Sequence, residues 1–497
     1  MTTIQLDHLT FGYDGQALLF DNASFDLDTS WHLGLVGRNG RGKTTLLRLL
    51  LGELDAPGHL SVPVPLHYFP QPIADPTALT LYAMQAISDA EQWQLERELN
   101  LLAVDPDVLW RPYADLSGGE QTKVRLALLF VDTAHFALID EPTNHLDTAS
   151  RQHVAAYLRR KSGFIVVSHD RDFLDAITDH TLAIDKQQIT LFAGNYSVYA
   201  AEKPRQDAFE RATDAKLRTD INRLRQTARE KAQWAHAREG DKHGDPHQAG
   251  NGAVANKGFI GARAARVMQK RKNLERRMDA EIDHKAQLLQ NIETIAPLTI
   301  ETRPDHHDVY VHLAALSLAY ADGTPLFAPV SFDVHRGDRI ALVGPNGIGK
   351  SSLLLALLHR FKGTVHGTIS YPQSLRMSVQ RQRYEDNVGT LAALAAARQL
   401  DYQALLNNLK KLGLERSAFT TPIEHLSMGQ QKKVELAQSL VTPANLLVWD
   451  EPLNYLDLYN QDQLADSLLA HQPTMLFVEH DQAFIDRVAT HVIELHR

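Results

Sequence analysis

The stretch LGLVGRNGRGKTTLLRLL, residues 33–50, decides the fold and much of the chemistry of this chain. An apolar run is followed by a glycine-rich loop of the form G-x-x-x-x-G-K-T and then by a leucine-rich segment, which predicts a strand, a turn and a helix. In such a loop, backbone N–H groups and the helix N-terminus surround phosphate, and Lys43 reaches the outer phosphates of a nucleotide. IALVGPNGIGKSSLLLAL, residues 340–357, repeats the pattern and gives Lys350 the same role.

Three further motifs occur twice in the same order, so the chain contains an internal duplication. The pairs lie 310 or 311 residues apart: LSGGEQ (116–121) with LSMGQQ (426–431), ALIDEPTNHLD (137–147) with LVWDEPLNYLD (447–457), and IVVSHD (165–170) with LFVEHD (476–481). Each copy alternates β-branched runs with helical stretches, which predicts an α/β fold with a largely parallel sheet. We expect ATPase domains at 1–200 and 308–497, joined by a linker at 201–300.

The composition excludes several classes of protein. The chain has 497 residues, of which 44% are hydrophobic and 22% charged, so collagen, a coiled-coil rod and a mostly disordered chain are excluded. It has no cysteine, which excludes disulfides, thiolate zinc sites and cysteine-held iron–sulfur clusters. The first residues do not show the basic segment followed by an apolar segment that is typical of a secretory signal. No apolar run reaches the roughly 18 residues of a membrane helix. We therefore expect a cytoplasmic protein without a membrane segment.

The linker differs from its flanks in charge and in periodicity. The chain has a net charge of −9, whereas residues 195–300 carry 20 Lys and Arg against 14 Asp and Glu, a net of +6. Apolar residues at coiled-coil spacing predict helices over 201–239 and from 262 to about 295, with a glycine-rich tip at 240–261. This predicts a basic, antiparallel two-helix hairpin that could lie against a polyanion, although a solvated helical linker would show the same charge.

Carboxylates that follow apolar runs supply the metal and proton chemistry of a phosphate-loop ATPase. Asp140 and Asp450 end such runs, where an aspartate lies near Mg²⁺, and the hydroxyls of Thr44 and Ser351 follow the loop lysines, where a Mg²⁺ ligand is required. The next residues, Glu141 and Glu451, can orient and deprotonate the water that attacks the outer phosphate of ATP.

The LSGGEQ string separates this chain from other phosphate-loop ATPases, and both flanks resemble ATP-binding cassette ATPases. In that family the serine and second glycine of this signature bind the outer phosphate held by the opposite cassette. The composite sites implied are Ser117 and Gly119 with Lys350, and Ser427 and Gly429 with Lys43. The second signature departs from the family pattern at Met428, which puts equal turnover at the two sites in doubt.

The same resemblance implies roles for further side chains. Tyr13 and Tyr320 would stack on adenine, Gln71 and Gln373 would sense Mg²⁺ and the attacking water, and His169 and His480 would be switch histidines near the outer phosphate. Asp147 and Asp457 would couple the two sites. The remaining nucleotide-binding positions are Gly37, Asn39, Gly40, Gly42, Thr45, Gly344, Asn346, Gly347, Gly349 and Ser352. Core tyrosines, ordinary loop glutamines and structural histidines are the alternatives.

Two cassettes around a basic linker resemble the ABC-F proteins, as does the linker entry GNYSVYAAEK at 194–203. Within that group, the chain most resembles the antibiotic-resistance branch of the Lsa and Vga type. The segments that carry this resemblance begin at the residues named here: FGYDG at Phe11, WHLGLVGRNGRGKTTLLRLL at Trp31, KGFIGARAARVMQKRKN at Lys257 and EPLNYLD at Glu451. Between Leu51 and Tyr68 lie 16 residues, too few for the helical arm of housekeeping members.

This resemblance implies a Mg²⁺-dependent ATPase that binds the ribosome. The linker would contact ribosomal RNA and the peptidyl-site tRNA, and its tip would approach the peptidyl-transferase centre. Resistance to lincosamides, streptogramin A compounds and pleuromutilins would follow. The implied protein is a monomer with two intramolecular composite ATP sites. A housekeeping ABC-F translation factor and the ATPase subunit of a transporter are the alternatives.

Overall fold

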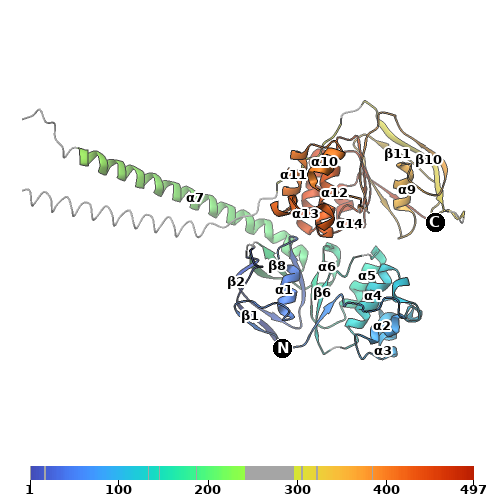
Figure 1. The fold of residues 1–497 in the computed structure, drawn as a ribbon, viewed down its shortest axis with the longest axis horizontal. Coiled ribbons are helices and arrows are strands. Elements are labelled where there is room, and N and C mark those ends of the chain that lie inside the picture. Colours follow the sequence, from blue (N-terminus) through green and yellow to red (C-terminus); the bar gives the residue numbers. More distant parts are fainter. Residues whose placement is uncertain are drawn as a thin grey trace, which may run out of the picture. The chain divides into compact units, whose positions relative to one another are not determined.

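The structure, a computed structural model, describes residues 2–240 and 296–497, apart from positions 16–17, 133, 145, 186, 304–305, 321–322, 383 and 385. The chain divides into two units, one formed by Met1–Tyr199 with Ile295–Arg497 and one by Ala200–Thr294. The first unit contains both copies of the duplicated domain, here called cassette 1 and cassette 2 (Figure 1).

Cassette 1 is built on a six-stranded sheet in the order β5-β6-β7-β3-β8-β9, which is parallel except for the last pair. A second sheet has the antiparallel order β2-β1-β4. The strands are β1 Thr3–Phe11, β2 Phe20–Asp28, β3 His32–Gly37, β4 His59–Ser61, β5 Leu66–Phe69, β6 Phe136–Asp140, β7 Phe164–Val167, β8 His180–Asp185 and β9 Gln188–Ala193. The helices are α1 Lys43–Leu50, α2 Thr80–Gln85, α3 Gln92–Leu101, α4 Gly118–Leu129, α5 Thr148–Leu158 and α6 Arg171–Ile177, with 3₁₀ turns η1 Pro106–Trp110 and η2 Tyr113–Asp115.

Cassette 2 repeats this topology, with a parallel sheet in the order β14-β15-β16-β12-β17 and an antiparallel sheet in the order β11-β10-β13. Its strands are β10 Val309–Ala319, β11 Val330–His335, β12 Arg339–Val343, β13 Thr364–Ser370, β14 Met377–Gln380, β15 Leu446–Asp450, β16 Met475–Val478 and β17 His491–Glu494. Its helices are α9 Lys350–Leu357, α10 Leu391–Ala397, α11 Tyr402–Lys411, α12 Met428–Val441, α13 Leu458–His471 and α14 Gln482–Val488, with 3₁₀ turns η3 Arg416–Phe419 and η4 Ile423–His425. The predicted fold class, α/β with two phosphate-loop cassettes, is confirmed.

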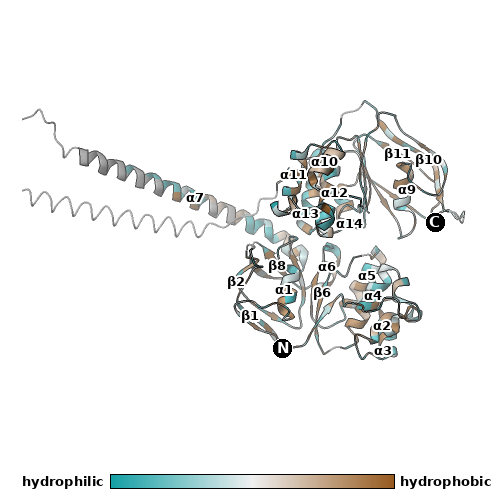
Figure 2. Cartoon of the chain, viewed as in Figure 1, coloured by the Kyte–Doolittle hydropathy of each residue, from teal (hydrophilic) through white to brown (hydrophobic). Residues whose placement is uncertain are grey.

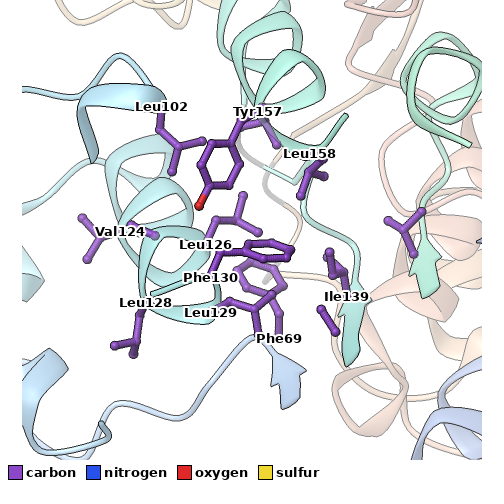
Figure 3. Packing of buried hydrophobic residues seen from close by; sticks show 14 of the residues in the cluster. Phe69, Leu102, Val124, Leu126, Leu128, Leu129, Phe130, Ile139, Tyr157 and Leu158 are labelled. Carbon is purple, nitrogen blue, oxygen red and sulfur yellow. The ribbon is translucent and has the colours of Figure 1, made fainter. Parts of the chain in front are cut away.

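Alternating strand residues build two hydrophobic layers in cassette 1, one on each face of the main sheet. On β6, Leu138 packs on the side of α1 and the antiparallel sheet, whereas Ile139 packs on the side of α4 and α5. Because both faces are covered, the strands are continuous apolar runs rather than alternating ones. Figure 3 shows the second layer, where Phe130 lies against Tyr157 and Leu129.

The long helix α7, Tyr196–Gly240, confirms the first of the two predicted linker helices. Its 45 residues correspond to roughly 68 Å of helix at 1.5 Å per residue. The predicted tip and second linker helix lie outside the described residues. Figure 2 shows that the coloured part of α7 is largely hydrophilic, in contrast to the hydrophobic strands of the cassettes. Within the described part of the chain, no helix combines the length and the apolar character needed to cross a bilayer.

Phe130→Ala should lower the free energy of unfolding by about 3–5 kcal/mol, because it removes a large side chain that is 3% exposed and leaves a cavity beside Tyr157. Urea denaturation followed by circular dichroism measures this change. Phe209→Ala is the matched control, since Phe209 is 75% exposed on α7 and its loss should change stability by less than about 0.5 kcal/mol. Equal urea midpoints for the two variants would contradict the assignment of Phe130 to the core.

Candidate functional site

The two phosphate loops have the same local geometry. Each follows an inner strand of its sheet, β3 or β12. Gly42 and Gly349 precede α1 and α9 with φ of +95° and +105°, a region that favours glycine. A Cβ at Gly42 would also lie 2.8 Å from the Phe20 ring. Lys43 Nζ donates to Gly37 O at 2.7 Å, and Lys350 Nζ donates to Gly344 O at the same distance. Burial lowers the pKa of both lysines, opposed by nearby carboxylates.

The predicted Mg²⁺ ligands lie beside each other in both cassettes. Thr44 Oγ1 donates to Asp140 Oδ2 at 3.0 Å, and Ser351 Oγ donates to Asp450 Oδ1 at 3.1 Å. Burial raises the pKa of Asp450 to about 6. In cassette 1, Gln71 Oε1 is a buried oxygen without a hydrogen-bond partner among the described residues. Hydroxyl, carboxylate and amide oxygens are hard donors, so these residues fit Mg²⁺ held together with substrate phosphates.

Each predicted catalytic glutamate lies near its predicted switch histidine. Glu141 Oε1 is 3.1 Å from His169 Nε2, and Glu451 Oε1 is 3.8 Å from His480 Nε2. Burial, reinforced by Asp140, raises the pKa of Glu141 to about 8. Burial lowers the pKa of His169 to about 3 and that of His480 to about 4, so both rings are neutral near pH 7. A neutral imidazole can accept or donate a proton beside the glutamate that orients water.

The structure corrects one predicted position. Gln373 is exposed in the turn after β13, whereas Gln382 follows β14 and donates to Glu451 Oε2 at 2.9 Å. Sheet register explains the difference: Phe69 pairs with Ile139, and Gln380 pairs with Trp449, so Gln71 and Gln382 both lie two residues beyond matching positions. The spacing could have shown this, because Gln71 and Gln382 precede Asp140 and Asp450 by 69 and 68 residues.

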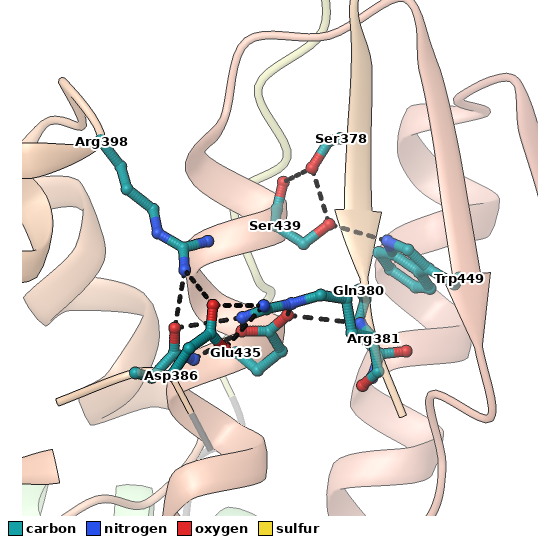
Figure 4. A network of polar contacts seen from close by, with 9 residues as sticks. Ser378, Gln380, Arg381, Asp386, Arg398, Glu435, Ser439 and Trp449 are labelled. Atoms are coloured by element: carbon teal, nitrogen blue, oxygen red, sulfur yellow. Dashed lines mark hydrogen bonds and ion pairs between the residues drawn. The ribbon is translucent and has the colours of Figure 1, made fainter. Parts of the chain in front are cut away.

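The neighbouring Arg381 anchors the loop of Gln382 (Figure 4). Its guanidinium donates to Glu435 on α12 at 2.8 Å and to both oxygens of Asp386 at 2.7 Å. The hydrogen bonds to Glu435 raise the pKa of Arg381 further above its ordinary value, so the side chain stays charged. With further bonds to Asn387 and to the second oxygen of Glu435, this planar group makes five hydrogen bonds, which hold the backbone next to Gln382.

Each signature serine is the N-cap of a helix. Ser117 begins α4 and Ser427 begins α12, and each forms a capping box with the residue three positions on, Glu120 or Gln430. The N-terminus of a helix of this length attracts anions through its N–H groups and dipole. The signature therefore presents an anion-binding helix end, and Met428 leaves that end intact because its backbone N–H remains.

Each signature lines a cavity together with residues from the phosphate loop of the other cassette. Ser427 and Gly429 line a cavity of about 360 Å³ together with Asn39, Gly40, Glu141 and His169, here called site 1. Ser117 and Gly119 line a cavity of about 370 Å³ together with Asn346. A larger cavity of about 770 Å³ contains Tyr320, Lys350, Ser351, Gln382, Glu451 and His480. The last two cavities are here called site 2.

Asp457 connects the cassettes at site 1. Its Oδ1 accepts from Asn460 N and caps α13, while its Oδ2 accepts from Asn39 N in the opposite phosphate loop at 2.8 Å. Although burial opposes it, the Lys433 ammonium 3.8 Å away lowers the pKa of Asp457, so the carboxylate stays ionised. Asp147 caps α5 in the same way and lies beside Asn346 in site 2. Lys433 was not predicted from the sequence, although it follows the signature at a fixed distance.

The two predicted adenine-stacking tyrosines lie at the surface. Tyr13 is 38% exposed and Tyr320 is 48% exposed, which disfavours the alternative of core tyrosines. Their hydroxyls lie 3.2 Å from Thr45 Oγ1 and 3.1 Å from Ser352 Oγ. Each tyrosine hydroxyl therefore lies beside the start of the helix that follows its phosphate loop, and each ring is partly exposed.

Comparisons with known proteins agree with this geometry. A family model described as ABC transporter matches residues 20–144 and 327–454. The chain is 28% identical to the ribosome protection protein VmlR of Bacillus subtilis (strain 168), over 92% of this chain and 80% of that protein. It is 25% identical to the energy-dependent translational throttle protein EttA of Mycobacterium tuberculosis (strain CDC 1551 / Oshkosh), over 96% and 89%. Among solved structures, an RNase-L Inhibitor aligns with a TM-score of 0.63 at 19% identity, over 98% of this chain and 87% of that chain, which shows the shared fold.

Gln382→Ala should lower the kcat for ATP by at least about tenfold, because the side chain that touches Glu451 is lost and the reacting groups shift. Gln373→Ala is the matched control and should leave kcat unchanged, since Gln373 is exposed and outside the three cavities. Steady-state phosphate release measures both. The reverse pattern would return the metal-sensing role to Gln373.

The double variant Glu141→Gln, Glu451→Gln should lose at least about 100-fold in ATP turnover while still binding ATP, because an amide cannot accept the proton of the attacking water. Phosphate release and equilibrium binding of labelled ATP measure the two properties. Lys43→Ala with Lys350→Ala is the control that should lose binding as well. Turnover near the wild-type rate in the glutamine variant would exclude these glutamates as the general bases.

Proposed function

The chain belongs to the ATP-binding cassette family, within its ABC-F group, and on that premise we propose that it binds the ribosome in an ATP-dependent manner and protects it from antibiotics that act at the peptidyl-transferase centre. Hydrolysis of ATP is the activity of its two cassettes. The observation that carries the proposal is that signature and phosphate-loop residues of opposite cassettes line shared cavities in a chain that also has a long helix, α7.

Contacts across site 1 support closure within one chain. Asn39 binds the Asp457 carboxylate through its backbone and donates from Nδ2 to Tyr455 O at 3.1 Å. Arg171 of cassette 1 forms an ion pair of 2.9 Å with Asp462 of cassette 2. These contacts join α6 and a phosphate loop of cassette 1 to the loop and first turns of α13. A second copy of the chain is therefore not needed to place Ser427 and Gly429 opposite Lys43.

The residues of the site give a mechanism for closure and release. Lys43 and Lys350 hold the outer phosphates of two ATP molecules, and the N-termini of α4 and α12 bind the same phosphates from the opposite cassette. Bound Mg²⁺, held by the hydroxyl and aspartate of each loop, would neutralise phosphate charge. Glu141 and Glu451 accept a proton from the attacking water. Once phosphate leaves, the signature helix ends lose their anion, and the cassettes separate.

The linker supports a polyanionic partner. Residues 216–277 carry 16 Lys and Arg against six Asp and Glu, a net charge of +10. Lysine and arginine bind phosphate in a sequence-independent way and release counterions, and a helix pair recognises the shape of structured RNA. Ribosomal RNA and the peptidyl-site tRNA are the partners that we propose for this segment, which implies action in the cytoplasm.

The segment between α1 and β5 favours the resistance branch over a housekeeping translation factor. In the structure this segment contains one short strand, β4 His59–Ser61, and no helix. A helical arm inserted here, which the resemblance leads us to expect in housekeeping members, is thus missing from this described segment. VmlR, which is named as a ribosome protection protein, is similar over most of both chains.

With ATP present, the double variant Glu141→Gln, Glu451→Gln should sediment with ribosomes, since it binds ATP without reopening. The interaction should weaken steeply between about 50 and 200 mM salt, because basic residues displace counterions from RNA. Sucrose-cushion centrifugation with purified ribosomes measures both effects, and the variant Lys43→Ala, Lys350→Ala is the control that should stay in the supernatant. Recovery with membranes and not with ribosomes would favour a transporter subunit.

Deletion of residues 243–255 from the predicted tip should remove antibiotic protection while ATPase activity and thermal stability stay nearly unchanged. Loop closure entropy changes by only about 0.6 kcal/mol per doubling of loop length, so trimming costs the fold little. Growth on lincosamides, streptogramin A compounds and pleuromutilins measures protection.

Phe259→Ala should weaken protection too, through lost stacking on a base; an accompanying drop in melting temperature would instead assign Phe259 to packing. Full protection by the trimmed protein would move the mechanism to the linker helices, and no protection by the wild-type chain would favour a housekeeping factor.

A further inference from the structure

The loops that carry the two catalytic glutamates have the same backbone conformation. Glu141 and Glu451 have φ of +55° and +50°, and their N–H groups donate to Val167 O and Val478 O, both at 2.9 Å. A non-glycine residue keeps a left-handed conformation when surrounding contacts hold it there. The contacts around each loop therefore decide where the carboxylate of the general base points.

In cassette 1 these contacts are neutral. Thr143 Oγ1 and Ser168 Oγ lie 3.0 Å apart and join the glutamate loop to the residue that precedes His169. Both side chains are buried, with exposed fractions of 5% and 1%. Thr122, on α4, donates to Gly118 O of its own helix at 2.9 Å. The loop of Glu141 is thus joined to the end of β7 through two hydroxyl groups.

Cassette 2 has different residues at all three positions, and their contacts are rearranged. After the signature, Lys432 stands where cassette 1 has Thr122. Two residues after the glutamate, Leu453 stands where cassette 1 has Thr143, and directly before the histidine, Glu479 stands where cassette 1 has Ser168. Leucine has no polar group, so the side-chain contact of cassette 1 cannot form. Instead, Lys432 Nζ donates to the backbone oxygen of Glu451 at 2.8 Å, and Glu479 Oε2 accepts from the backbone N–H of Leu453 at 3.1 Å. The two charged side chains hold the backbone on both sides of Pro452.

Burial makes these two charges costly unless their contacts compensate. Lys432 is 1% exposed and Glu479 is 4% exposed. Burial lowers the pKa of Lys432 to about 8, opposed by the carboxylates of Glu479, Glu451, Asp450 and Glu435, and burial raises the pKa of Glu479 to about 7. Glu479 also accepts from His480 N at 2.7 Å, so it ties the glutamate loop to the switch histidine. Both charged groups thus bond to backbone within two residues of a catalytic side chain.

We propose that Lys432 and Glu479 form a backbone clamp that positions Glu451 for proton abstraction at site 2, whereas site 1 positions Glu141 through the hydroxyls of Thr143 and Ser168. Lys432 Nζ bonds to the backbone carbonyl of Glu451 and not to its carboxylate, so we assign it as a positioning residue. Gln382 and Asn454 hold the carboxylate itself, at 2.9 and 2.6 Å from Glu451 Oε2. The two ATP sites consequently depend on different residues for the same chemical step.

The experiment measures each site separately in the full chain. Glu141→Gln leaves site 2 as the hydrolysing site, and Glu451→Gln leaves site 1. Labelled ATP is bound first, and Mg²⁺ is then added to start a single turnover. The rate of this first hydrolysis is recorded, because it does not depend on how slowly the cassettes reopen afterwards. Lys432→Thr should slow hydrolysis in the Glu141→Gln background on the order of tenfold, with the ATP dissociation constant within about twofold, because misplacing the base affects the chemical step.

Two further variants separate positioning from a general loss of structure. Lys432→Thr with Leu453→Thr and Glu479→Ser rebuilds the neutral contact of cassette 1 and should restore most of the rate. Thr122→Ala, at the matching position of cassette 1, should leave hydrolysis in the Glu451→Gln background unchanged, since Thr122 bonds to its own helix. Three results would each overturn the proposal. They are an unchanged rate for Lys432→Thr, equal slowing by Lys432→Thr in both backgrounds, and failure of the triple replacement to restore the rate. If Lys432→Thr does not fold, the triple variant and Lys432→Met provide the same comparison.

Discussion

Parallel hydrogen bonding between neighbouring strands brings the chemistry of each cassette to one edge of its sheet. In cassette 1, β3 lies between β7 and β8, and β6 pairs with β7 so that Asp140 is opposite Val167. The phosphate loop, the Asp140–Glu141 pair and His169 all follow the carboxyl ends of these strands. Since parallel strands end on the same side, residues more than 100 positions apart in sequence meet at one edge of the sheet. Cassette 2 repeats this arrangement with β12, β15 and β16.

Polar groups at helix ends form contacts between the cassettes in the described part of the chain, and Leu458 of α13 packs with the core of cassette 1. Asp457 caps α13 with one oxygen and binds Asn39 with the other, so one carboxylate serves its own helix and the opposite phosphate loop. Ser427 caps α12 and faces the same loop from the other side of the cavity. Polar contacts of this kind can open when the ligand charge changes. ATP binding is therefore suited to control the distance between the two domains.

The two duplicated sites share one topology, but different side chains hold the loops of their glutamates. The phosphate loops, the hydroxyl–aspartate pairs and the signature N-caps match closely between the copies. The loops around the glutamates do not, because Lys432, Leu453 and Glu479 change both charge and hydrogen-bonding groups relative to their counterparts in cassette 1. The carboxylate of Glu451 accepts from Gln382 and Asn454, while Glu141 lies 3.1 Å from His169. Shared backbone geometry is thus compatible with different control of the same reaction.

Short motifs with a fixed local geometry were predictable from the residues alone. The glycine loops, the strand-ending aspartates and the first linker helix follow from turn chemistry, periodicity and spacing, and the duplication showed that all of them occur twice. The prediction of Gln373 was wrong because strand register decides which loop reaches Glu451, and only the spacing from Asp450 indicated Gln382. The backbone contacts of Lys432 and Glu479 depend on side chains that approach from α12 and β16, which are distant in sequence. Local conformation is set by neighbouring residues, whereas the partner of a buried polar group is set by the packing of separate elements, and for that reason these contacts required the folded structure.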